Sequence, residues 1–152
     1  KMKKSKFYVD WVITNRLGLG PKPRKIDHIK TLKDFGFKSI LSLCSEDEAP
    51  VIEDCNLYLD FYRSYLPDHK ANRNPSENEL LMALSTYKKI KNNGPVFVHC
   101  VASVERSPLL CLAILIQDKK LNFQDAFDYL MQVHPQTNPL IGQLRVLESL
   151  NK

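Results

Sequence analysis

The sequence predicts an α/β fold in which a central, mostly parallel or mixed sheet is flanked by helices on both faces. Short apolar segments bounded by turn-forming residues alternate along the chain with longer segments of helical periodicity, and this alternation favours a parallel sheet. With 152 residues, of which 43% are hydrophobic, the chain is long enough for one sizeable core and too short for two ordinary domains. We therefore expect a single domain over residues 1–152, with a flexible basic N-terminus over residues 1–6.

The strands are predicted from short apolar runs. Residues 39–43 and 96–98 have the composition of buried strands. A weaker strand pattern covers residues 57–65, and residues 17–19 add a further short strand. In a sheet of this kind, the ligand site lies beyond the carboxyl ends of the strands.

Three surface helices are predicted from capping residues and from apolar side chains at helical spacing. Ser76 and Glu79 form a capping box before a periodic segment that ends at residues 93–95. Asn122 precedes a second amphipathic segment, and residues 138–139, an Asn-Pro pair, open a last one. Each of these helices has one apolar stripe, which we expect to be buried.

Charge and hydropathy limit the partners. The chain has 22 Lys and Arg against 17 Asp and Glu, and its formal charge of +5 suits nucleic acid, an acidic membrane surface or a phosphorylated substrate. No basic and aromatic strip lies beyond residues 1–6, so we expect no nucleic-acid partner. The longest apolar run, residues 109–116, is shorter than the roughly 18 residues typical of a membrane span, so we expect no stable membrane insertion.

The N-terminal segment and the cysteines indicate a reducing compartment. No apolar stretch of signal-peptide length follows residues 1–6, so we do not expect export. The four cysteines, at positions 44, 55, 100 and 111, have neither the density of a disulfide scaffold nor the spacing of a zinc site. The sequence therefore predicts a cytoplasmic protein without a metal site.

The loop that leads into one further predicted helix, residues 107–119, contains the candidate catalytic residues. Residues 107–119 are apolar nearly all round, so this helix is predicted to be central and buried. The loop before it reads His99-Cys100-Val101-Ala102-Ser103-Val104-Glu105-Arg106-Ser107. Its backbone N–H groups, curled round one centre at a helix N-terminus, form an oxyanion cradle that also stabilises a thiolate at Cys100. Arg106 offers a planar fork to two phosphate oxygens.

The pattern His99-Cys100-(x5)-Arg106-Ser107 resembles the signature loop of the cysteine-dependent protein tyrosine phosphatase superfamily. The short chain is most similar to the dual-specificity branch. The resemblance implies that Cys100 attacks phosphorus to form a cysteinyl phosphate, which water then hydrolyses, and that no metal or cofactor is needed. It also implies that Ser107 stabilises the thiolate and that His99 orients the loop from behind. The residues implied to bind the phosphate are Val101, Ala102, Ser103, Val104, Glu105 and Arg106.

Asp68 is the candidate general acid. It lies 32 residues before Cys100 in a polar loop between a strand and a helix, and dual-specificity phosphatases, which this chain resembles, place their acid at a similar spacing. Protonation of the leaving oxygen by a carboxylic acid typically contributes about 10²–10⁴ in rate. A simple turn aspartate is the alternative. His69, Lys70 and Arg73 either attract a second anionic group or belong to a solvated loop.

Two positions in the loop depart from the family pattern. Ser103 stands where the family generally has glycine, and a positive φ there would add strain. Glu105 stands where the family has a small or neutral residue, and we expect its side chain to point away from the cradle, held by a lysine. The segment also resembles the loop of the cell-cycle phosphatases built on a rhodanese fold, in which Glu105 would replace Asp68 as the acid. The position of Asp68 and the three helices predicted after the loop favour the dual-specificity fold.

Three further residues have open roles. Cys44 resembles the second thiol of some family members, and a disulfide with Cys100 would protect the nucleophile from over-oxidation. The alternative is a buried cysteine that acts as a small apolar residue. Gln143 either reaches the site or faces solvent, and we favour the solvent. His134 is interpreted as a helix end.

These observations predict a phosphomonoester hydrolase, most similar to a dual-specificity protein phosphatase. We expect a monomer that acts on phosphotyrosine and on phosphoserine or phosphothreonine in proteins. A phosphoinositide, nucleotide or RNA phosphatase is an alternative, but lipid-specific members carry lysines in the loop where this chain has Val101, Val104 and Glu105. A catalytically weak phosphate-binding module is a second alternative, motivated by Ser103 and Glu105.

Overall fold

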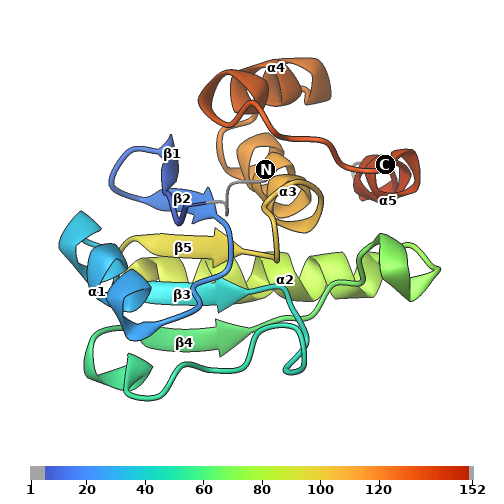
Figure 1. Ribbon diagram of the computed structural model, residues 1–152. Coiled ribbons are helices and arrows are strands. Elements are labelled where there is room, and N and C mark those ends of the chain that lie inside the picture. Colours follow the sequence, from blue (N-terminus) through green and yellow to red (C-terminus); the bar gives the residue numbers. More distant parts are fainter. Residues whose placement is uncertain (1–5, 151–152) are drawn as a thin grey trace, which may run out of the picture.

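The computed structural model describes residues 6–150, which contain a five-stranded sheet and five α-helices (Figure 1). In chain order the elements are β1 (Asp10–Ile13), β2 (Leu17–Gly20), α1 (Ile26–Phe35), β3 (Ser39–Ser42), β4 (Asp60–Arg63), α2 (Glu77–Ile90), β5 (Val96–His99), α3 (Arg106–Asp118), α4 (Phe123–Val133) and α5 (Ile141–Ser149). The flexible N-terminus predicted over residues 1–6 lies almost entirely outside the described residues. None of the helices within residues 6–150 is long and apolar enough to cross a membrane.

The sheet is mixed, as predicted, and its strand order is β1-β2-β5-β3-β4. The β1–β2 pair is antiparallel, and the other neighbours are parallel. His99 at the end of β5 pairs with Gly20 on one side and with Ser42 on the other, and Ser42 pairs in turn with Arg63. Four strands therefore end at the same level, which brings the segments that follow them to one edge of the sheet.

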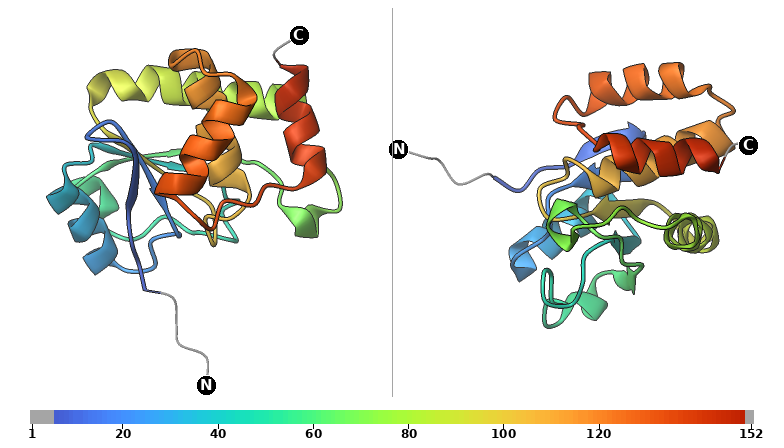
Figure 2. Two further views of the ribbon diagram at one scale, coloured as in Figure 1. Left: turned by 90° about the horizontal axis from the view of Figure 1, so that it is seen from above. Right: turned by 90° about the vertical axis from the view of Figure 1, so that its right-hand side faces the viewer.

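Helices cover both faces of the sheet, and the side chains of β5 show how the faces divide. Val96 and Val98 belong to the large core that includes residues of α2, α3, α4 and α5. Phe97 points to the opposite face, into a smaller core with Ile29 and Leu32 of α1. Viewed from above, α1 lies on one side of the sheet and α2 on the other (Figure 2, left).

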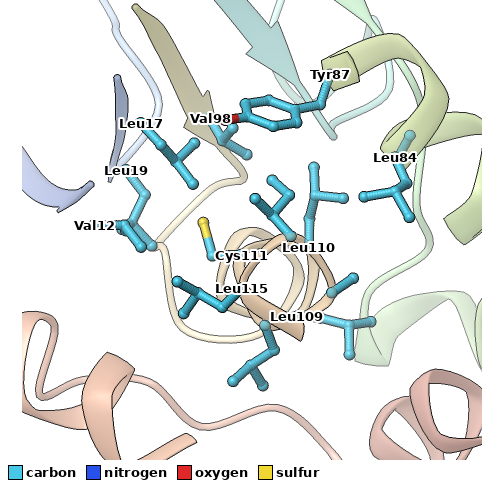
Figure 3. Close-up of a cluster of buried hydrophobic side chains, with 14 of the residues drawn as sticks. Val12, Leu17, Leu19, Leu84, Tyr87, Val98, Leu109, Leu110, Cys111 and Leu115 are labelled. Carbon is cyan, nitrogen blue, oxygen red and sulfur yellow. The ribbon is translucent and has the colours of Figure 1, made fainter. Parts of the chain in front are cut away.

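α3 is the central helix, which confirms the sequence prediction. Every residue from Arg106 to Leu115 is buried. Leu109, Leu110, Cys111 and Leu115 radiate from the helix into side chains of the strands and of α2 (Figure 3). Full burial of one such leucine contributes about 1.5–3 kcal/mol, so the N-terminus of α3 is held firmly against the edge of the sheet.

The predicted helix caps are present. The Ser76 hydroxyl accepts a hydrogen bond from the Glu79 N–H at 3.1 Å, and the Glu79 carboxylate accepts one from the Ser76 N–H at 2.9 Å. Asn122 accepts from the Asp125 N–H at 2.8 Å and so caps α4. The last helix begins at Ile141, slightly later than the Asn-Pro pair predicts.

Two elements of the structure, β1 and α1, were not predicted from the sequence. In β1, Val12 is the one buried side chain, and this short edge strand shows little of the alternation typical of a strand. α1 starts without a side-chain cap at Lys25 and buries Ile29 and Leu32 alone. The strand predicted over residues 57–65 is shortened to β4, because residues 55–57 form a 3-10 turn.

Gly20 allows a close approach between β2 and the N-terminal segment, which yields a test of the fold. A Cβ atom at Gly20 would overlap the backbone oxygen of Tyr8 and crowd the Phe97 ring. We expect Gly20→Ala to lower the free energy of unfolding by about 1–3 kcal/mol, as overpacked cores do, measured by urea denaturation. Gly142→Ala is the control, because its Cβ would meet the movable side chain of Asn74. Equal stability of both variants would contradict the close approach.

Candidate active site

The segments that follow β2, β3, β4 and β5 line a pocket of about 650 Å³ at the carboxyl edge of the sheet. Its lining consists of Lys22, Ser45, Asp47, Glu48, Tyr65, Asp68, His69, Lys70, Ala71, Cys100, Val101, Ala102, Val104, Glu105 and Arg106. The lining thus contains both cationic and carboxylate side chains. No group of three or more His, Cys, Asp or Glu side chains in the described part of the chain is arranged to hold a metal ion.

Cys100 is buried at the start of the signature loop, which we define as residues 100–106. Its Sγ lies 3.3 Å from the Oγ of Ser107, in the first turn of α3. At this distance the Ser107 hydroxyl can donate a hydrogen bond to a thiolate. The positive end of the α3 dipole faces the same atom. The thiol therefore lies where a negative charge is stabilised.

Arg106 is 2% exposed and forms a bidentate ion pair with Glu48. Its Nη1 and Nη2 donate to the two carboxylate oxygens at 3.1 and 2.8 Å, and Nη1 also donates to the Leu66 carbonyl at 3.0 Å. Burial opposes the charge of Arg106, but the hydrogen bond to Glu48 and the nearby ionisable groups hold the pKa of Arg106 above its usual value. Burial likewise opposes the charge of Glu48, yet the bonds from Arg106 and Ser45 hold the pKa of Glu48 below its usual value.

This ion pair leaves part of the guanidinium for a ligand. Among residues 6–150, no hydrogen bond uses the Nε–H of Arg106, and Nη2 has one N–H left beyond its bond to Glu48. These are the two neighbouring donors that a phosphate takes from an arginine fork. The sequence reasoning did not find Glu48, which lies 58 residues before Arg106 in an irregular segment with no motif of its own.

Asp68 reaches the pocket from the acid loop, which we define as residues 67–72. One carboxylate oxygen, Oδ1, accepts a hydrogen bond from the Lys70 N–H at 2.9 Å and caps a 3-10 turn. The other, Oδ2, lies 3.8 Å from Nη2 of Arg106. The structure therefore brings Asp68, Arg106 and Cys100 to one pocket.

Glu105 turns toward the acid loop and α5. Its Oε2 lies 2.8 Å from Nδ1 of His69, and its Oε1 accepts a hydrogen bond from Nε2 of Gln143 at 3.2 Å. The lysine that we expected to hold Glu105 is thus replaced by a histidine and an amide. The expectation that Gln143 faces solvent is wrong: Gln143 is 1% exposed, because the start of α5 packs against the signature loop.

Ser103 adopts the left-handed backbone conformation that the family's glycine would adopt, with φ of 62°. This conformation costs a residue with a side chain about 1–2 kcal/mol. Buried hydrogen bonds oppose that cost: the Ser103 Oγ lies 3.0 Å from the Oγ of Ser107, and the Ser103 carbonyl accepts from Nε2 of His134 at 2.6 Å. The strain foreseen at this position is present and is compensated locally.

His134 has a larger role than the helix end that the sequence suggests. It does follow α4 directly, but its fully buried ring joins Ser103 to Asp10, whose Oδ2 lies 2.7 Å from the ring Nδ1. In the same connection, the Asn138 N–H donates to the Val104 carbonyl at 2.8 Å. No local pattern marks these residues, because their partners are far away along the chain.

His99 lies behind the signature loop. Its buried Nδ1 is 3.1 Å from the backbone oxygen of Cys100, which can only accept, so the ring donates there. Burial lowers the pKa of His99 to about 4. A neutral imidazole is suited to hold the loop backbone and unsuited to act as an acid near neutral pH.

Cys44 packs next to Cys100 in a small buried cluster completed by Ala49. Both cysteines are free thiols. Burial raises the pKa of Cys44 to about 12, so this thiol stays protonated near neutral pH. A disulfide between Cys44 and Cys100 stays a prediction.

Comparison with known proteins matches residues 19–152 to the model of the dual specificity phosphatase catalytic domain. Human dual specificity protein phosphatase 5 is 39% identical over 62 residues, which are 39% of this chain and 16% of that relative, so the chain spans a small part of its length. The crystal structure of Tk-PTP in its active form superimposes with a TM-score of 0.80 at 20% identity, over 93% of this chain and 95% of that chain. PTPMT1 in complex with PI(5)P superimposes with a TM-score of 0.75 at 19% identity, over 88% of each chain.

The burial of His99 predicts an effect of pH on stability. Its pKa falls from the usual 6.5 to about 4, so below the usual value the unfolded chain binds a proton that the folded state excludes. The free energy of unfolding should therefore fall by about 1.4 kcal/mol per pH unit as the pH drops between these two values. Ring-nitrogen NMR should show a neutral His99 at about pH 6. A protonated ring at that pH would contradict the prediction.

Proposed function

The chain belongs to the dual specificity phosphatase family, and from this premise we propose that it hydrolyses phosphate monoesters of proteins through a cysteinyl-phosphate intermediate. One observation carries the proposal. Cys100, Arg106 and Asp68 line a single pocket, although Asp68 comes from a different loop than the other two. A nucleophile, a phosphate-binding fork and a proton donor in one pocket are what this reaction requires.

In the first step, the phosphate binds to the N–H groups of the signature loop and to the free donors of Arg106. The Cys100 thiolate attacks phosphorus while the bond to the leaving oxygen breaks, and Asp68 donates its proton to that oxygen. The side chain of Arg106 keeps its orientation because Glu48 and the Leu66 carbonyl hold its other donors. Its charge stabilises the negative charge on the equatorial oxygens.

In the second step, water attacks the phosphorus of the cysteinyl phosphate. Asp68, now a carboxylate, accepts a proton from the water, and the phosphorus–sulfur bond breaks to release inorganic phosphate. The electron pair of that bond returns to the Cys100 sulfur. The Ser107 hydroxyl, 3.3 Å away, stabilises the departing thiolate.

The pocket favours a single phosphate group on an apolar or aromatic stem. Tyr65 and Val101 are exposed at its edge, and its two lysines, Lys22 and Lys70, are balanced by carboxylates such as Asp47. A polyphosphorylated lipid or nucleotide calls for an excess of cations. We therefore propose phosphotyrosine and phosphoserine or phosphothreonine in proteins as substrates. The complex of PTPMT1 with PI(5)P makes a phosphoinositide the second candidate.

The arrangement of Ser103 and Glu105 supports turnover rather than phosphate binding alone. The side chain of Ser103 is turned toward Ser107 and His134, and the carboxylate of Glu105 faces His69 and accepts a hydrogen bond from Gln143. Neither departure from the family pattern removes a group that the reaction needs.

We also propose that the protein works in the cytoplasm, where Cys100 stays reduced. Under oxidation, Cys44 would protect Cys100 by forming a disulfide with it. Hydrogen peroxide would oxidise the Cys100 thiolate to a sulfenate, with water formed from the peroxide, and the sulfenate would take up a proton from solvent to give the sulfenic acid. The Cys44 thiol would then displace the sulfenic oxygen as water and form a disulfide. The packing of the two side chains in one cluster supports this step.

The phosphatase reaction is tested by the hydrolysis of a small aryl phosphate. We expect turnover by the wild type and a loss of more than about 10³-fold in Cys100→Ser, since the hydroxyl is a far weaker nucleophile. Cys55→Ala, at a cysteine that does not line the pocket, should retain activity. Phosphopeptides and a phosphoinositide assayed in parallel rank the substrate classes. An inactive wild type would contradict the proposal.

The redox role is tested by peroxide treatment followed by peptide mapping. We expect a Cys44–Cys100 disulfide in the wild type and sulfinic acid at Cys100 in Cys44→Ala. Sulfinic acid at Cys100 of the wild type, without a disulfide, would contradict the role of Cys44.

A further inference from the structure

The acid loop has few connections to the rest of the molecule. Residues 69–72 are exposed, with 57% of the His69 side chain accessible to solvent, whereas Pro67 is buried and Asp68 is partly buried. Within the described residues, one hydrogen bond joins residues 67–72 to the remainder of the chain, and it runs from His69 to Glu105. The 3.8 Å approach of Asp68 to Arg106 is longer than a hydrogen bond. Among the hydrogen bonds of the described residues, the contact between His69 and Glu105 is thus the one that ties the exposed part of the acid loop to the signature loop.

Glu105 is itself fixed from the other side. The Gln143 amide donates to Oε1 of Glu105, and the Gln143 carbonyl oxygen accepts from the Leu140 N–H at 2.8 Å. Because Gln143 is buried and its oxygen accepts from Leu140, its NH₂ group faces Glu105. This contact in turn fixes the orientation of the Glu105 carboxylate. The remaining oxygen of Glu105 faces His69. A chain of contacts thus runs from the start of α5 through Glu105 to the residue next to Asp68.

This chain of contacts accounts for a glutamate in a loop that binds phosphate. An unpaired carboxylate beside the phosphate would oppose binding, but both oxygens of Glu105 are occupied by donors. The same contacts turn both oxygens of Glu105 toward His69 and Gln143. Asp68, by contrast, has Oδ1 held by the Lys70 N–H and keeps Oδ2 on the side of Arg106.

We propose that Glu105 is a positioning residue, which holds the acid loop through His69 so that Asp68 lies over the bound phosphate. The proposal rests on the phosphatase function proposed above. It assigns no proton transfer to Glu105. Loss of the contact would leave the nucleophile and the phosphate cradle intact and would misplace the general acid, and misplacement by about 1 Å costs on the order of 10²-fold in rate.

The test compares aryl phosphates with good and poor leaving groups. With phenyl phosphate, we expect kcat/KM of Glu105→Gln and of His69→Gln to fall about 10–10²-fold, because this ratio reports formation of the cysteinyl phosphate, in which this leaving group needs its proton. With a nitrophenyl phosphate, kcat/KM of both variants should stay within about threefold of wild type, whereas kcat can fall with every substrate because Asp68 also accepts the proton of water in the second step. Asp68→Asn should show the same selectivity with a larger loss. The double variant of Glu105 and His69 should lose no more than the single ones.

Controls separate this role from others. Arg73→Gln removes an exposed ion pair of similar geometry beside the acid loop, 2.8 Å between Arg73 and Glu79, and should behave as wild type. His69→Gln lies on an exposed turn, so it tests the contact even if Glu105→Gln fails to fold. An equal loss with all substrates, or none, would overturn the proposal. So would selectivity in Glu105→Gln without any in Asp68→Asn, which would make Glu105 the acid. A wild type inactive on every substrate would instead refute the phosphatase function.

Discussion

The buried positive charge of Arg106 is the constraint on which the pocket depends. A guanidinium inside a protein is stable only where carboxylate and carbonyl oxygens replace its water. These oxygens come from Glu48, in the segment after β3, and from Leu66, in the segment after β4. Arg106 itself is the first residue of α3. Three segments must therefore converge on one side chain, and their convergence forms the pocket.

Three of the four carboxylates that line the pocket have neighbouring hydrogen-bond donors. Glu48 pairs with Arg106, and Glu105 accepts from His69 and Gln143. The Asp68 carboxylate accepts from a backbone N–H of its own turn. Because these three carboxylates have donors elsewhere, they do not compete with the proposed phosphate for the N–H groups of the signature loop. The contacts of Glu48 with Arg106 and of Glu105 with His69 also hold the loops relative to one another. The same hydrogen bonds therefore satisfy the carboxylates and set the geometry of the loops.

The back of the signature loop is held as firmly as its front. α3 anchors one end through buried leucines, and His134 holds the Ser103 carbonyl while its other nitrogen faces Asp10. These contacts stabilise the left-handed conformation of Ser103, which turns the loop round its centre. N–H groups that are fixed before the substrate arrives need no reorganisation during the reaction, and this is the main advantage of such a cradle.

The sequence by itself determined what depends on neighbours along the chain. The spacing of Cys100 and Arg106 identifies the loop, the Ser76 and Asn122 caps locate two helices, and the uniform apolarity of α3 predicts its burial. β1 and α1 escaped prediction because each buries few side chains. Only the tertiary structure decided the partners of the loop: Glu48, His134 and Gln143 lie 58, 31 and 38 residues from the loop residues that they contact. The strand order brings these segments together, and the need of buried polar groups for partners then assigns their roles.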